Sequence, residues 1–120
     1  MKEKYGKITY KNQEYIMPFN FNVMQAIQEE YGTLEKWGNL SDGIDEDGNL
    51  REVDAKAVIF GAKEMLNEGI DIMNEENGTD LKPFTLKQAG RLVTELGMEE
   101  ILGTINETVI ESTKDDELKN

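Results

Sequence analysis

The sequence contains no histidine and no cysteine, and only two of its residues are proline. Without histidine there is no imidazole base and no Ser–His or Cys–His pair. Without cysteine there is no disulfide, no thiolate nucleophile and no structural zinc site. No apolar run reaches the length of about 18 residues that a membrane span needs, and the first ten residues lack a signal-peptide core. The sequence therefore favours a cytoplasmic protein.

Acidic residues outnumber basic residues by 25 to 13 among the 120 residues, which gives a formal net charge of −12. The excess is uneven, because residues 1–40 have no net charge while residues 41–80 contain three basic and twelve acidic groups. An acidic surface repels the phosphate backbone, and the sequence has no stripe of Lys and Arg to neutralise it. We therefore expect no nucleic-acid binding.

Adjacent carboxylates recur in the sequence, for example at Glu29-Glu30 and Glu75-Glu76. An enzyme that uses two carboxylates needs both of them at a fixed separation in one shielded cleft. Neighbours on a helix point about 100° apart, so these pairs are typical of a solvated face. Together with the missing His and Cys, this pattern predicts a protein that is not an enzyme and has no catalytic residues and no cofactor.

The length and the apolar pattern predict one domain over residues 1–112, followed by a flexible acidic tail over residues 113–120. Alternating segments predict a β-hairpin over residues 7–17, with a three-residue connection at 11–13. The remaining segments read as helices. The predicted fold class is mostly α (strictly α+β), a small helical domain with an N-terminal β-hairpin and a C-terminal helix pair.

The first half of the helical region begins at an asparagine. Asn20 or Asn22 suits the cap of a helix that runs to Tyr31. A short helical turn over residues 34–37 follows, and residues 39–50 read as a loop because glycines alternate there with acidic residues.

The second half contains three further helical segments. Asp54 is the predicted cap of a helix that ends at Asn77, and a break or kink at Gly69 is compatible with its pattern. The segment 85–88 matches a capping box and begins the next helix. Gly97 ends that helix, so it should form an antiparallel or strongly bent pair with the last one.

The acidic loop is the strongest candidate for a metal site. Alignment of Gly48 with the glycine of a calcium-binding helix–loop–helix motif makes Asp45, Asp47 and Asp54 candidate calcium ligands. The first ligand position is then Gly43, which has no side-chain oxygen, and Asp54 is shorter than the usual glutamate. A turn without any ion explains the same residues, and we favour the turn.

Some methionine and aromatic side chains, on or beside the apolar stripes of the predicted helices, are candidates for contact with a partner protein. We select Trp37, Phe60, Met65 and Met73, because methionine adapts to varied apolar surfaces and Phe60 falls beside the apolar stripe. The alternative is that they are core residues. Of the four, Trp37 and Phe60 are the best candidates for an exposed apolar contact.

Six short segments, taken in order, carry a likeness to a known family: 7–10, 19–22, 30–37, 85–88, 96–100 and 107–110. Over roughly residues 7–113 the chain resembles the tail assembly chaperones of long-tailed (siphovirus-like) bacteriophages. This resemblance implies a protein of virion assembly, in the cytoplasm of the bacterial host and absent from the mature virion. Its implied partners are the phage tape-measure protein and the tail-tube protein, with no nucleic acid and no membrane; homo-oligomerisation stays open.

Two other functions remain as alternatives. One is a minor structural component of the virion, such as a head–tail connector or a tube-associated protein. The other is an acidic inhibitor that mimics nucleic acid, which the net charge of −12 suggests. The neutral first 40 residues disfavour such mimicry, because it needs carboxylates arrayed like phosphates.

Overall fold

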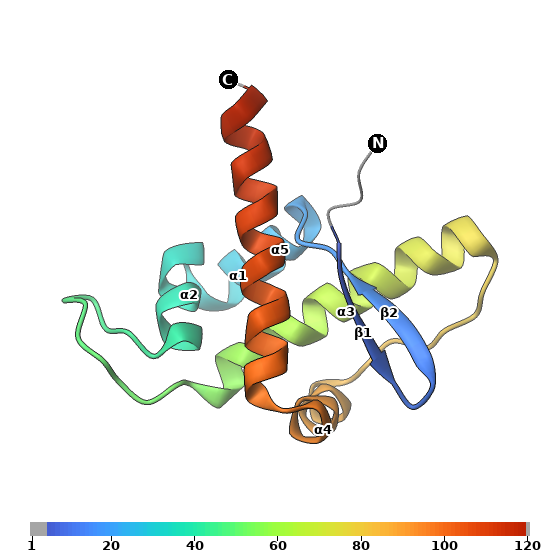
Figure 1. Cartoon of the computed structure of the whole chain (residues 1–120), viewed down its shortest axis with the longest axis horizontal. Helices are drawn as coiled ribbons and strands as arrows, with labels where there is room; N and C mark the ends of the chain where they lie inside the picture. The colour runs from blue at the N-terminus through green and yellow to red at the C-terminus, as the bar shows by residue number, and fades with distance from the viewer. Residues whose placement is uncertain (1–4, 120) are drawn as a thin grey trace.

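The structure is a computed structural model that describes residues 5–119, with side chains described up to residue 112 (Figure 1). The chain begins with a β-hairpin in which β1 (Gly6–Tyr10) pairs antiparallel with β2 (Gln13–Met17). Lys11 and Asn12 connect the strands with positive φ angles of 52° and 64°. The hairpin is confirmed, but the predicted three-residue connection is wrong. Two residues suffice because positive φ at both positions gives a type I′ turn, whose twist matches that of the strands.

Five helices follow the hairpin in residues 5–119, so the predicted fold class, mostly α with a small β part, is confirmed. None of these helices has the length and apolar character to cross a membrane. Their bounds are α1 (Phe21–Tyr31), α2 (Leu34–Asp42), α3 (Ala55–Asn77), α4 (Leu86–Leu96) and α5 (Met98–Lys119).

Local capping chemistry explains where three of the helices begin. Asn20, rather than Asn22, accepts a hydrogen bond from the first turn of α1, and Asp54 does the same for α3. Thr85 and Gln88 form the predicted capping box of α4, because the side chain of each residue accepts a hydrogen bond from the backbone N–H of the other. These side chains satisfy backbone N–H groups that have no partner inside the helix, which is why the sequence identifies them.

Helix α2 is longer than the sequence predicts. The expected turn over residues 34–37 continues through Gly38, and the helix ends at Gly43, whose φ is 74°. Gly38 costs the helix only about 1 kcal/mol relative to alanine. The cap at Thr33 and the burial of Trp37 offset that cost, because both hold the helix in place from its first turn. The acidic loop therefore begins at residue 43 rather than 39.

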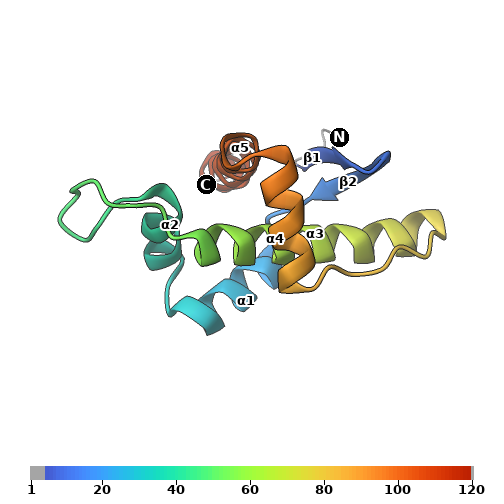
Figure 2. The ribbon, with the colours of Figure 1, turned by 90° about the horizontal axis from the view of Figure 1, so that it is seen from below.

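Helix α3 is the centre of the fold and contacts α1, α2, α4, α5 and β2. Seen from below, it lies between α1 on one side and α5 with the hairpin on the other, while α2 lies beside its N-terminal end and α4 crosses it (Figure 2). Its buried face includes Val58, Ala62, Met65 and Leu66, none of which is exposed at all. This position makes α3 the scaffold for the other helices and for β2.

No break or kink occurs at Gly69, where α3 runs uninterrupted through its 23 residues. The glycine instead permits close packing, because a Cβ at Gly69 would overlap the carbonyl group of Ile16 in β2. The backbone of the hairpin therefore lies directly on the backbone of α3.

Helices α4 and α5 form a strongly bent pair around Gly97, whose φ is 100°. In Figure 1 α4 is seen end-on while α5 stands upright, so the antiparallel alternative is wrong. The backbone of residues 113–119 continues α5 as a helix, although the sequence predicts a separate tail there. The flexibility of that segment stays a prediction.

Candidate partner-binding surface

A groove of about 880 Å³ lies between α3 and the outer face of α4. We call it the α4 groove. It is lined by Lys56, Ile59, Leu86, Lys87, Gly90, Arg91, Thr94 and Glu95.

The floor of the α4 groove is apolar because Leu86 is partly exposed at the start of α4 and because Gly90 carries no side chain to cover Ile59. Leu86 is the first residue of α4 and is 39% exposed, although the sequence places it on the buried stripe. Gly90 follows one turn later, and a Cβ there would meet only Ile59 Cδ1, at 3.6 Å. The missing side chain at Gly90 leaves an opening over Ile59.

The walls of the α4 groove are basic although the chain as a whole carries a net charge of −12. Lys56, Lys87 and Arg91 line it, against the single carboxylate of Glu95. Lys56 also forms an exposed ion pair with Glu30, at 3.3 Å. An exposed pair of this kind contributes little stability, so Lys56 can exchange Glu30 for another carboxylate at small cost.

A second hollow, of about 460 Å³, adjoins the α4 groove and shares Arg91 with it. We call it the hairpin hollow. Its aromatic wall consists of Tyr10, Tyr15 and Phe84, with ring centroids 5.4 Å apart for Tyr15 and Phe84 and 6.3 Å apart for Tyr10 and Phe84. Burial, and then the neighbouring Tyr10, raises the pKa of Tyr15, so its hydroxyl stays protonated and able to donate a hydrogen bond.

Two asparagines on α3 position the segment that leads into α4. Asn67 donates to the carbonyl oxygen of Phe84 at 2.9 Å and accepts from the Phe84 N–H at 2.7 Å. Asn74 makes the same pair of contacts with Leu81, at 3.0 and 2.9 Å. The segment before α4 is therefore fastened to α3, which fixes one wall of the groove relative to the other.

Two of the four predicted contact residues are buried in the core. Trp37 is 4% exposed, stacks on Phe19 with centroids 6.0 Å apart, and donates from its indole N–H to the Ala57 carbonyl oxygen at 2.9 Å. Met65 has no exposed surface. The expectation of an exposed Trp37 is wrong, because the gap beside Gly61 on α3 admits the indole ring.

Phe60 and Met73 are partly exposed residues of α3 and do not line the α4 groove. The Phe60 ring meets the Tyr31 ring edge-on with centroids 5.6 Å apart, and the Lys63 ammonium lies 5.1 Å from its centroid. Burial, followed by the charges of Asp54 and Glu30, raises the pKa of Tyr31. A role of Phe60 or Met73 in partner binding stays a prediction.

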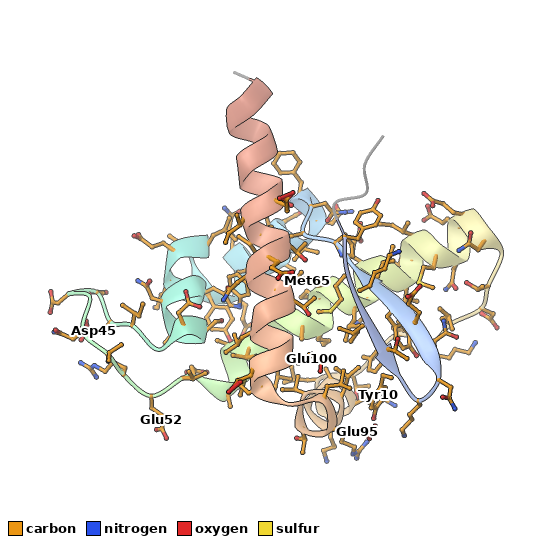
Figure 3. The ribbon with its side chains drawn as sticks, in the orientation of Figure 1. Tyr10, Asp45, Glu52, Met65, Glu95 and Glu100 are labelled. Atoms are coloured by element: carbon orange, nitrogen blue, oxygen red, sulfur yellow. The ribbon has the colours of Figure 1, made fainter. Side chains whose placement is uncertain are left out.

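The structure gives two of the three candidate calcium ligands, Asp45 and Asp54, separate local partners, while the third, Asp47, is exposed. Asp45 Oδ1 accepts from the backbone N–H groups of Asp47 and Asn49, both at 2.9 Å, and Oδ2 pairs with Arg51 at 3.1 Å. Asp54 Oδ1 accepts the N–H of Ala57 as the cap of α3. Within residues 5–112 no group of three or more acidic side chains is arranged to hold a metal ion. The loop is a turn built around Asp45 (Figure 3).

Sequence reasoning missed the residues of the α4 groove because each looks ordinary alone. Lys87 and Arg91 lie four residues apart, as do Leu86 and Gly90, so each pair shares a face of α4. That spacing is visible in the sequence. The apposition of Ile59, which comes from α3, is visible only in the fold.

Comparison of the chain with protein-family models, with curated proteins and with solved structures gives no match.

Proposed function

We propose that this chain is a non-enzymatic assembly chaperone or adaptor of long-tailed bacteriophages. It binds the tape-measure protein and helps to recruit tail-tube subunits, as its resemblance to tail assembly chaperones implies. The observation that supports this proposal is the α4 groove, an open apolar channel on an otherwise strongly acidic domain.

A groove of this kind suits a helical client. An amphipathic helix lays its apolar face into a groove and leaves its polar face in water. A tape-measure protein, as the resemblance describes it, is long, helical and prone to aggregate. Each bound copy of the chaperone would cover part of an apolar stripe that otherwise associates with other copies.

The net charge of −12 supports the same role. A large net charge of one sign keeps proteins soluble and apart. The acidic loop lies at one end of the molecule, and α4, which lines the groove, crosses α3 nearer the middle (Figure 2). When copies of this chain bind a client through their grooves, their acidic surfaces would therefore face the solvent.

Co-expression with a phage tape-measure protein tests the proposal. We expect the soluble fraction of the tape-measure protein to rise and the two proteins to co-purify. Gly90→Phe fills the groove, so this variant should leave the tape-measure protein insoluble, whereas Gly90→Ala should act as the natural chain does. A tape-measure protein that stays insoluble with the natural chain contradicts the proposal.

Mass spectrometry of purified mature particles tests the place of the protein in assembly. A chaperone is absent from the finished virion, so no peptide of this chain should be detected there. Its presence at a fixed ratio to the tail proteins would instead identify a structural component of the virion.

A further inference from the structure

We propose that the α4 groove binds one amphipathic helix whose apolar side chains are flanked by carboxylates, and that Lys87 and Arg91 hold those carboxylates. The assignment of this helix to the client protein rests on the proposed function above. The acidic character of the helix follows instead from the basic residues that line the groove.

The charge of the surface around α4 is opposite to that of the chain. The α4 groove and the hairpin hollow together contain five basic residues against two acidic ones, whereas the whole chain has 25 acidic and 13 basic residues. The five are Lys11, Lys56, Lys82, Lys87 and Arg91, and the two are Asp80 and Glu95. A patch of this sign on an acidic protein favours an acidic segment of a partner in the bound complex.

Lys87 and Arg91 are the two cations best placed to act on a ligand. Both are exposed, and no ion pair within residues 5–112 involves either of them. They lie one helical turn apart, so their side chains share a face of α4. The guanidinium group of Arg91 can bind a carboxylate through two parallel hydrogen bonds, whereas Lys87 acts as a point charge.

The length of the groove along α4 suits a helix of two to three turns. The residues that line it on α4 run from Leu86 to Glu95, which at 1.5 Å per residue is a length of roughly 14 Å. Anchors at positions i, i+4 and i+7 of a bound helix cover a similar length. The opening that Gly90 leaves over Ile59 is the natural seat of one apolar anchor.

A second copy of this chain is a weaker occupant. Two copies that each carry a net charge of −12 repel each other before any contact forms. Self-association is nevertheless measurable by sedimentation velocity. A natural chain that dimerises, with Lys87→Glu abolishing the dimer, would assign the groove to a second copy and overturn the proposal.

Synthetic peptides test the ligand chemistry directly. The probe is a fluorescent helical peptide of about 18 residues with Leu at i, i+4 and i+7, flanked by Glu. A control peptide has Lys at every Glu position, and a second control keeps the composition but shuffles the Leu positions. Anisotropy titrations of the full chain should show the acidic peptide binding at least about tenfold more tightly than either control. Equal binding of the acidic and basic peptides would overturn the proposal.

Variants of the chain locate the binding. Lys87→Glu and Arg91→Glu should each lower the affinity for the acidic peptide by about tenfold or more. Lys36→Glu on α2 makes the same change in net charge away from the groove and should have little effect. Gly90→Phe should abolish binding while Gly90→Ala preserves it, with circular dichroism melts confirming that both fold. An equal loss in Lys36→Glu and Lys87→Glu would show that only net charge matters and would refute the site.

The same variants separate this inference from the proposed function. If Lys87→Glu binds the acidic peptide weakly but still solubilises the tape-measure protein, the proposed function stands and the groove is not the client site. If the natural chain binds the acidic peptide but does not solubilise the tape-measure protein, the ligand chemistry stands and the proposed function fails.

Discussion

The indole ring of Trp37 on α2 lies against the Cα of Gly61 on α3. A Cβ on Gly61 would come within 2.5 Å of Trp37 Cζ2. The ring is held there by its stacking on Phe19 and by the hydrogen bond to Ala57, so any shift of the ring would disturb both contacts. The contact joins the two helices that flank the acidic loop.

Gly61→Ala should therefore destabilise the protein. Alanine improves helix propensity by up to about 1 kcal/mol, but overpacking against a fixed aromatic ring costs about 1–3 kcal/mol. We expect a net loss of roughly 1–2 kcal/mol in the free energy of unfolding, measured by urea denaturation.

Gly38→Ala is the matched control, since Gly38 also lies in a helix but nothing is within 4 Å of the added Cβ. It should stabilise the protein by about 0.5–1 kcal/mol. Equal effects of the two substitutions would mean that Trp37 does not occupy the gap at Gly61.

Gly69→Ala should be more damaging than Gly61→Ala. Its Cβ would overlap the backbone carbonyl of Ile16, which is fixed in the hairpin and cannot rotate away as a side chain can. We expect a loss of about 3 kcal/mol or more. Gly103→Ala on α5, where nothing lies within 4 Å, supplies the control. Urea denaturation measures the free energy of unfolding of both variants. A Gly69→Ala variant as stable as Gly103→Ala would contradict the close packing of the hairpin on α3.

These glycines also show where sequence reasoning succeeds and where it stops. The caps at Asp54 and Thr85 are predictable because a cap and the N–H it satisfies lie within three residues of each other. The sequence pattern ends a turn just before Gly38 and is compatible with a break at Gly69, yet the helices continue through both. The reason at Gly69 is a contact with Ile16, which lies far away in the sequence and leaves no local signal.

The candidate site also contains one feature that the sequence predicts and one that only the fold identifies. The basic pair Lys87 and Arg91 can be recognised from its spacing alone. The exposure of Leu86 cannot be recognised from the sequence. Leu86 lies on the apolar stripe of α4, and the sequence does not say whether another element covers that position. Trp37 shows the reverse, since the sequence makes it a candidate for an exposed apolar contact and the gap at Gly61 buries it.

Asn67→Ala should loosen the segment that carries α4. The substitution removes both hydrogen bonds to Phe84 and leaves its N–H without that partner, which costs about 1–3 kcal/mol. Hydrogen exchange at the Phe84 amide should become faster, and affinity for the acidic peptide should fall because one wall of the groove moves. Asn106→Ala, an exposed position of α5, should change neither. Unchanged exchange at Phe84 would show that Asn67 does not fasten the segment.

Titration of Asp45 should control the order of the acidic loop. The backbone N–H of Asn49, with Arg51 and the N–H of Asp47, lowers the pKa of Asp45 below its ordinary value of 3.8. A carboxyl whose pKa is lower in the folded state stabilises that state above its ordinary pKa, and this contribution is lost as the pH falls through the lowered value. The amide shifts of Asp47 and Asn49, followed by NMR from neutral to acid pH, should therefore change with a midpoint below 3.8. Arg51→Gln should raise that midpoint yet keep it below 3.8, because the two backbone donors remain. A midpoint at or above 3.8 in the natural chain would refute the hydrogen-bonded turn at Asp45.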